Sequence, residues 1–203
     1  HLNANFDLSE VVEMTIEANP DDLTEKKIKS YKNTPINRFS IGVQSFHNKD
    51  LRYMNRAHDA SQAESCIKAI QNAGWDNISI DLIYGLPTLP NDKWLENLVQ
   101  VVELGIPHLS AYALTVEDKT PLHYAIKTGQ QAQLDEKRCN QQFQTLMNFL
   151  PNRGWKQYEL SNFSKPRFES KHNSSYWQQK TYLGLGPSAH SFDGKSRMWN
   201  IAN

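Results

Sequence analysis

The stretch NISIDLIYGLP, from Asn77 to Pro87, decides the fold class. Its apolar run has the length of a buried strand, and Gly-Leu-Pro ends it, because proline restricts the residue before it. Four further stretches of strand-like sequence occur along the chain. They are EMTIEANP (Glu13 to Pro20), RFSIGVQSF (Arg38 to Phe46), HLSAYALTVE (His108 to Glu117) and GWKQYELSNF (Gly154 to Phe163).

Helical segments separate these strands, and capping residues mark where several of them begin. Thr24 is the expected N-cap of the first, Ser61 and Glu64 are expected to form a capping box, and Asn91 is expected to cap the helix that stops at Gly105. The expected helices cover residues 22–33, 48–58, 61–74, 91–105, 121–129 and 134–150, and a sixth short strand is expected after Tyr182.

Strands that alternate with helices predict βα units and a parallel sheet. The strands read as almost continuous apolar runs, which is typical of a sheet covered on both faces. An open doubly wound sheet and a (β/α) barrel of the TIM type both fit this pattern. The absence of a GxGxxG or GxxxxGK[ST] motif leaves dinucleotide and P-loop binding without support.

Composition narrows the functional classes. The 203 residues suit one large domain, and the 22 basic and 22 acidic residues cancel, so nothing favours a nucleic acid or an anionic membrane as partner. No apolar run is long enough to cross a bilayer, and the first residues lack the pattern of a signal peptide. Cys66 and Cys139 are the only cysteines, which fits a reducing compartment and predicts a cytoplasmic protein.

Polar side chains interrupt the apolar strands near their carboxyl ends. Glu17 closes the first strand, Gln44 closes the second, and Asp81 lies inside the third, although burying an unpaired polar group costs several kcal/mol. In a βα barrel these strand ends converge on one opening, and Arg56 lies on the connection between two of the strands. Two carboxylates, an amide and a guanidinium suit a zwitterionic ligand with hydroxyl groups. The alternative is that the four residues cap elements or form internal ion pairs.

The segment HNSSYW, His172 to Trp177, is expected in a loop and combines an imidazole with aromatic rings. A neutral imidazole can ligate iron and flat aromatic rings can flank a flat macrocycle, although a structural role is commoner for a histidine in such a segment. Asn173 could orient the ring of His172. Tyr176 and Trp177 are interpreted as packing residues rather than porphyrin-stacking groups. Histidines 1, 47, 58, 108, 123 and 190 compete for the role of ligand, and His190 could line the same barrel opening.

Taken together, these motifs resemble those of radical S-adenosylmethionine (SAM) proteins of the oxygen-independent coproporphyrinogen III oxidase family, in particular its heme chaperone branch. The resemblance extends over essentially the whole chain. It is carried by TIEANP (Thr15 to Pro20), RFSIGVQSF, the MNRAH around Arg56, SIDLIYGLP (Ser79 to Pro87) and LGLGPSAHSF, in the order in which the family has them.

The resemblance implies roles for individual residues. Glu17, Gln44, Arg56 and Asp81 match the SAM-contacting positions, with Arg56 at the methionyl carboxylate, while the other three are left undivided between the ammonium and the ribose hydroxyls. HNSSYW matches the HNxxYW motif associated with heme in the chaperone branch, and His172 would ligate the iron. The implied cofactors are SAM, a [4Fe–4S] cluster and heme.

The chain departs from the family in one respect, because it has no CxxxCxxC motif to hold the cluster. Cys66 and Cys139 each lie on an expected helix and are interpreted as buried thiols. We therefore expect residues 1–203 to be the central part of a radical SAM barrel that lacks about two N-terminal βα units and a C-terminal domain. The segment from about residue 164 to residue 203 is expected to lead out of this barrel.

Three functions remain open. The first is a heme chaperone that passes heme to a recipient protein. Such a protein could form a homodimer, and it would contact a membrane only through the recipient. The second is a coproporphyrinogen oxidase that decarboxylates propionate side chains, an oxidoreductase activity that residues 1–203 alone should not support. The third is an unrelated βα-barrel enzyme for a small polar metabolite.

Overall fold

The structure is a computed structural model that describes residues 2–202. The chain forms two compact units, of which the first ends at Phe168 and the second begins at Glu169. None of the helices in the described range is both long and apolar enough to span a bilayer.

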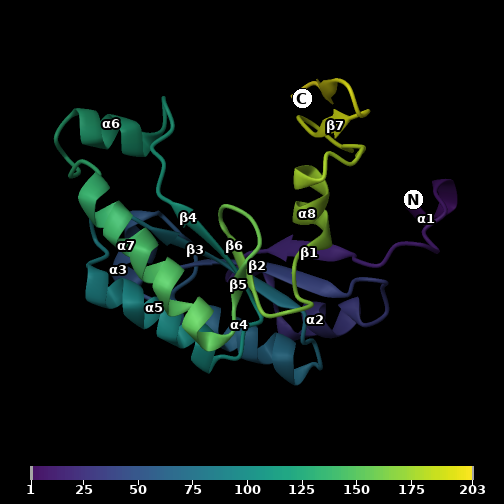
Figure 1. Cartoon of the computed structure of the whole chain (residues 1–203), viewed down its shortest axis with the longest axis horizontal. Coiled ribbons are helices and arrows are strands. Elements are labelled where there is room, and N and C mark those ends of the chain that lie inside the picture. Colours follow the sequence, from purple (N-terminus) through teal and green to yellow (C-terminus); the bar gives the residue numbers. More distant parts are fainter. Residues whose placement is uncertain (1, 203) are drawn as a thin grey trace. The chain divides into compact units, whose positions relative to one another are not determined.

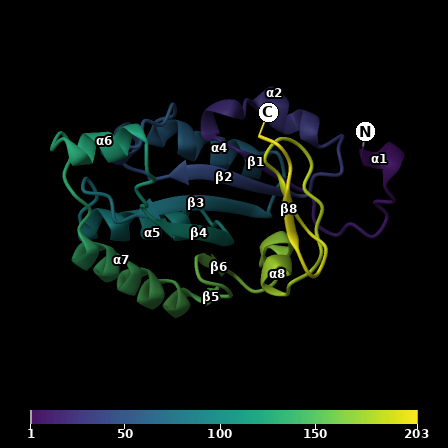
Figure 2. The ribbon, with the colours of Figure 1, turned by 90° about the horizontal axis from the view of Figure 1, so that it is seen from above.

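The first unit is built on a six-stranded sheet with the order β1-β2-β3-β4-β6-β5. Four parallel strands follow one another in chain order, as Figure 2 shows: β1 (Thr15–Ala18), β2 (Arg38–Gln44), β3 (Ile78–Tyr84) and β4 (His108–Ala113). A doubly wound sheet would reverse its strand order partway, and this sheet does not. The predicted α/β class with a parallel sheet is confirmed, and the sequential order is that of a barrel wall.

The expected fifth strand, residues 154–163, is wrong as a single element. It forms a hairpin of β5 (Lys156–Gln157) and β6 (Asn162–Ser164), and β6 runs antiparallel to β4. Two side chains bond to the backbone of the turn: Gln157 Nε2 donates to the Leu160 carbonyl at 3.0 Å, and the Ser161 amide donates to Glu159 Oε1 at 2.9 Å. Side chains that bond locally to the backbone favour turns over strands.

Four helices pack on one face of the sheet: α2 (Glu25–Tyr31), α4 (Ala60–Asn72), α5 (Asn91–Glu103) and α7 (Glu136–Phe149). Figure 1 shows α2, α4 and α5 along the same side of the strands. Burial of their apolar side chains against the strands supplies the main stabilisation, at roughly 25 cal/mol per Å². The unit also contains the short helices α1 (Leu2–Asn5), η1 (Pro20–Asp22), α3 (Asn48–Tyr53), α6 (Pro121–Lys127) and η2 (Pro151–Arg153).

The strands alternate between an apolar and a polar face, which corrects the interpretation of the strands as almost continuous apolar runs. The side chains of Phe39, Ile41, Ile80, Leu82 and Leu109 are fully buried on the helix side. The register places a second set on the opposite face, because side chains alternate along a strand. This polar face carries Glu17, Arg38, Ser40, Ser79, Asp81, His108 and Ser110.

The capping predictions are partly right. Thr24 caps α2 by accepting a hydrogen bond from the Lys27 amide. The capping box of α4 consists of Asp59 and Gln62 rather than Ser61 and Glu64, because the carboxylate of Asp59 takes the Gln62 amide at 2.8 Å. Asn91 is the first residue of α5 and not its cap.

The second unit contains α8 (Lys171–Trp177) and a two-stranded sheet of β7 (His190–Phe192) and β8 (Arg197–Trp199). HNSSYW is therefore helical and not a loop. The side chain of Ser170 caps this helix by accepting from the Asn173 amide, a signal that the expected loop overlooked. Gly184 is required by the close approach of the backbone, since a Cβ there would overlap the carbonyl of His190.

Candidate ligand site at the strand ends

Glu17 and Asp81 lie on the polar face of the sheet. Burial raises the pKa of Asp81 to about 6, and the negative charge of Glu17 acts in the same direction. A hydrogen bond with Ser110 and the charges of Arg38 and Arg56 oppose this shift of the Asp81 pKa. Asp81 is thus a partly desolvated carboxyl group that a ligand donor would stabilise in its ionised form.

Gln44 ends β2 in a strained turn. Its φ is +68°, and the amide of Ser45 donates to the carbonyl of Val43 at 2.9 Å, which is the two-residue hydrogen bond of a γ-turn. The pairing with β3 also shifts between Ile41 and Gln44, as at a β-bulge. Backbone strain of this kind clusters at functional sites, which supports Gln44 as a site residue.

The side chain of Gln44 folds back over Gly42. A Cβ at residue 42 would lie 2.8 Å from Gln44 Nε2 and 3.2 Å from Asn19 Oδ1. Glycine therefore leaves the space that the Gln44 amide occupies, and the loop after β1 reaches the same point. This close approach joins the ends of β1 and β2.

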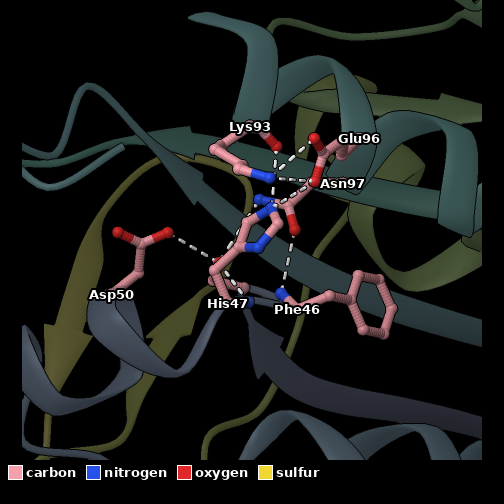
Figure 3. A network of polar contacts seen from close by, with 7 residues as sticks. Phe46, His47, Asp50, Lys93, Glu96 and Asn97 are labelled. Carbon is pink, nitrogen blue, oxygen red and sulfur yellow. Dashed lines mark hydrogen bonds and ion pairs between the residues drawn. The ribbon is translucent and has the colours of Figure 1, made fainter. Parts of the chain in front are cut away.

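A buried polar network holds the segment after Gln44. Figure 3 shows the Phe46 amide donating to Asn97 Oδ1 at 2.9 Å and His47 Nε2 bonded to the Lys93 carbonyl at 3.0 Å. Ser45 donates its hydroxyl to the fully buried Asp50 at 2.9 Å. These bonds connect the residues that follow β2 to α3 and α5, and they stabilise the backbone next to the γ-turn.

Arg56 is exposed on the loop between α3 and α4 and lines a cavity of about 660 Å³. Ile83 and Leu114, at the ends of β3 and β4, form its apolar wall, and Thr120 and Pro121 approach from the start of α6. A cavity of this size and mixed lining suits a small organic ligand.

Two further polar residues on this face were missed from the sequence. Arg38 is almost fully buried, and burial lowers the pKa of its guanidinium, opposed mainly by the charge of Glu13. Its Nε has no hydrogen-bond partner among the described residues, and its Nη1 reaches Thr15 Oγ1 at 3.5 Å. The period-two pattern Ser-Ile-Asp-Leu in β3 could have revealed the polar face.

His108 is the second missed residue. It bonds to Ser79 Oγ through Nδ1 at 2.6 Å and to the hydroxyl of Tyr158 through Nε2 at 2.7 Å. Burial lowers the pKa of His108 to about 3, so the ring is neutral at physiological pH. It serves as a structural bridge from β3 and β4 to the hairpin turn.

His172 is exposed on α8, and its Nε2 lies 2.9 Å from the hydroxyl of Tyr176, one helical turn later. The ring of Tyr176 also makes a T-shaped contact with the ring of Tyr182, with 4.7 Å between the ring centroids. Trp177 is largely exposed. The imidazole and two flat rings thus share the surface of one short helix.

Asn173 and His190 are the two residues predicted to lie near the His172 ring or at the same opening. The hydroxyl of Tyr176 is hydrogen-bonded to the His172 ring. The backbone amide of Asn173 donates to the hydroxyl of Ser170, and the orienting role of the Asn173 side chain stays a prediction. The ring of His190 lies tilted by 38° against that of Trp199, with 6.2 Å between the ring centroids, within the second unit. His1 lies outside the described residues.

The cysteines do not form a cluster site. Cys66 is buried, and burial raises the pKa of its thiol to about 11. Cys139 is half-buried, and burial also raises its pKa. Across residues 2–202 no three His, Cys, Asp or Glu side chains are grouped to hold a metal ion. The described residues therefore do not supply the thiolates of a [4Fe–4S] cluster.

Comparison with known proteins identifies the family. The profile described as "Radical SAM superfamily" matches residues 2–110. Heme chaperone HemW of Lactococcus lactis is 35% identical over 196 residues, which cover 97% of this chain and 52% of that protein. Heme chaperone HemW of Bacillus subtilis is 36% identical over 196 residues, covering 95% of this chain and 51% of that protein. The chain spans about half the length of these curated relatives.

A solved structure has the same fold. Coproporphyrinogen III oxidase (HemN) from Escherichia coli, a radical SAM enzyme, superimposes with a TM-score of 0.81 at 23% identity, covering 100% of this chain and 49% of that one. The predicted family resemblance is thus confirmed, and this family implies SAM and a [4Fe–4S] cluster as cofactors. The chain belongs to the radical SAM superfamily.

Proposed function

We propose that the whole protein is a heme chaperone of the radical SAM type. The main support is helix α8, which carries the exposed His172 and the rings of Tyr176 and Trp177. The chain that contains this helix resembles heme chaperones over nearly its full length. Imidazole is a common ligand of heme iron, and flat aromatic side chains pack against a macrocycle. His172 is the proposed iron ligand, and Asn173 a proposed orienting partner.

We propose a SAM site at the strand ends of the first unit. Arg56 would hold the methionyl carboxylate beside the 660 Å³ cavity, because a guanidinium pairs with a carboxylate in a bidentate way. The carboxylates of Glu17 and Asp81 and the side-chain carbonyl of Gln44 would accept hydrogen bonds from the ammonium and the ribose hydroxyls, and the Gln44 amide nitrogen would donate only to a hydroxyl oxygen. The raised pKa of Asp81 and the strained turn at Gln44 support this assignment.

The cofactors would divide between the residues described and the rest of the protein. SAM and a [4Fe–4S] cluster supply one-electron chemistry when both are bound. The thiolates of that cluster are proposed to lie in a part of the whole protein beyond residues 2–202. A heme-recipient protein as partner, homodimerisation and a cytoplasmic location are further parts of the proposal.

A hemin titration of the whole protein tests the heme proposal, with the Soret band as the signal. We expect His172→Ala to weaken hemin binding at least about tenfold and to shift the Soret maximum, because the iron loses an axial ligand. His123→Ala removes a partly exposed imidazole from α6 and is the matched control, expected to leave both readings unchanged. Equal hemin affinity and equal spectra for His172→Ala and the wild type would refute ligation by His172.

The fold likeness to coproporphyrinogen III oxidase favours a second candidate, oxidative decarboxylation of coproporphyrinogen III. An anaerobic assay of the whole protein with a reconstituted cluster, SAM and an electron donor tests it, and absence of protoporphyrinogen would remove this candidate. The third interpretation, an unrelated barrel enzyme, does not hold, because the chain belongs to the radical SAM superfamily.

A further inference from the structure

A buried histidine connects two residues of the proposed SAM site. His58 follows Arg56 by two positions, and only 1% of its side chain is exposed. Its Nε2 lies 3.0 Å from the carbonyl oxygen of Val43, the residue before Gln44. Because a carbonyl can only accept, Nε2 carries the hydrogen and His58 donates to β2.

The carbonyl of Val43 accepts two hydrogen bonds. One comes from His58 and the other from the amide of Ser45, which closes the γ-turn around Gln44. The donor from His58 therefore reaches the carbonyl that defines this turn. Loss of that donor would leave the carbonyl with a single partner in a buried place and weaken the support of a strained φ of +68°.

A carboxylate lies on the other side of the His58 ring and forms an ion pair with it when the ring is protonated. The Nδ1 of His58 lies 3.6 Å from Asp21 Oδ1 in η1, the short helix that follows β1. The ring thus spans the connection after β1, the end of β2 and the loop before α4. The next residue, Asp59, is the N-cap of α4, so the segment from Arg56 to the helix is anchored within three residues.

We infer that His58 is a positioning residue for the SAM site, which sets Arg56 and Gln44 relative to each other through the Val43 carbonyl. This inference rests on the proposed SAM site. Binding of the methionyl end of SAM would then depend on the His58 imidazole, although this ring does not contact the ligand. Loosening of the Arg56 loop should therefore affect a ligand with a carboxylate more than one without.

The test compares SAM with 5′-methylthioadenosine, which keeps the adenosine but lacks the methionyl carboxylate and ammonium. Dissociation constants are measured on the whole protein, reconstituted anaerobically, for wild type, His58→Leu and His58→Gln. We expect His58→Leu to raise the dissociation constant of SAM about tenfold, as for a lost buried hydrogen bond. The increase for methylthioadenosine should be smaller by a factor of at least about three. His58→Gln restores a side-chain N–H donor, and we expect it to recover most of the SAM affinity.

His47→Leu is the matched control. His47 also bonds a backbone carbonyl, that of Lys93 at 3.0 Å, but this bond joins the start of α3 to α5 and does not reach the Arg56 loop. We expect it to leave the ratio of the two dissociation constants unchanged. In an Arg56→Ala background, His58→Leu should add little to the loss of SAM affinity, because both changes act on the same contact.

The remaining outcomes distinguish failure of the positioning role from failure of the proposed SAM site. Equal weakening of both ligands by His58→Leu, or unchanged SAM binding, overturns the positioning role. A wild-type protein that binds neither ligand refutes the proposed SAM site itself. If His58→Leu does not fold, Asp21→Ala, which removes the carboxylate at Nδ1 from a partly exposed position, replaces it. We then expect a selective loss of about twofold for SAM, and equal affinities for SAM in Asp21→Ala and wild type overturn the inference.

Discussion

The hydroxyl oxygen of Tyr176 lies 2.9 Å from Nε2 of His172, one turn apart on α8. Nε2 is the ring nitrogen that is sterically freer to meet heme iron, so ligation there requires Tyr176 to leave. We expect Tyr176→Phe to bind hemin about fivefold more tightly, since a hydrogen bond contributes about 1 kcal/mol. Hemin titration measures this effect, with Ser174→Ala on the same helix as control. Weaker binding by Tyr176→Phe would mean that the tyrosine supports the bound state instead.

SAM binding should depend on pH through Asp81. Its pKa is raised to about 6 in the free protein, and a ligand ammonium or hydroxyl would favour the ionised carboxylate. We expect the affinity for SAM to be highest above pH 6 and to fall by up to about tenfold per pH unit below it. Equilibrium dialysis from pH 5 to pH 8 measures this dependence. Asp81→Asn should bind more weakly and lack the step near pH 6, and a step that persists in this variant would exclude Asp81 as its source.

Asp81 should also lower the stability of the fold at neutral pH. Its pKa is raised from 3.8 to about 6, so the native state holds a proton that the unfolded state has released, and the free energy of unfolding falls as pH rises between these values. The full shift corresponds to about 3 kcal/mol, at 1.36 kcal/mol per pKa unit. We expect Asp81→Asn to raise the free energy of unfolding at pH 7.5 by up to about this amount, measured by urea denaturation.

His108 provides the opposite pH dependence. Burial lowers its pKa from 6.5 to about 3, so the unfolded state binds a proton that the native state excludes, and stability is lost as pH falls through this range. In the wild type the two groups oppose each other between about pH 4 and pH 6. We therefore expect the unfolding free energy of Asp81→Asn to rise more steeply with pH in this window than that of the wild type. Parallel curves for the two proteins would contradict the assignment of the Asp81 shift.

Gly42→Ala should act on ligand binding through Gln44. The new Cβ would lie 2.8 Å from Gln44 Nε2, the end of a flexible side chain, so the amide must move while the backbone need not. We expect about a fivefold loss of SAM affinity with little change in the melting temperature, and almost no further loss in a Gln44→Ala background. A double-mutant cycle by calorimetry measures this coupling. Additive losses would show that Gly42 acts independently of Gln44.

The sequence alone predicted the elements that packing and local chemistry determine. Thr24 as a cap, the four parallel strands and the place of Gln44 at the end of β2 follow from turn residues and apolar runs. The hairpin at residues 156–164 was missed, because side chains of Gln157 and Glu159 bond to the turn between two short strands. HNSSYW was placed in a loop because the cap at Ser170 was overlooked.

The residues proposed for the candidate site were chosen from the sequence, but their geometry was not predicted. Glu17, Gln44, Arg56 and Asp81 were named from sequence, while the turn at Gln44 and the donor from His58 depend on backbone dihedral angles and on a contact across 15 residues. Arg38 was missed because it stands at the start of an apolar run, where it reads as the boundary of a strand. Its burial results from tertiary structure that no local pattern encodes.

The alternation along β2, β3 and β4 has an evolutionary consequence. Side chains that hold the helices in place and side chains of the polar face, where the SAM site is proposed, belong to different sets of positions on the same strands. Substitutions on one set need not disturb the other, so a lineage can exchange its chemistry while it keeps its architecture. A scaffold divided in this way can give rise to an enzyme in one descendant and a carrier in another.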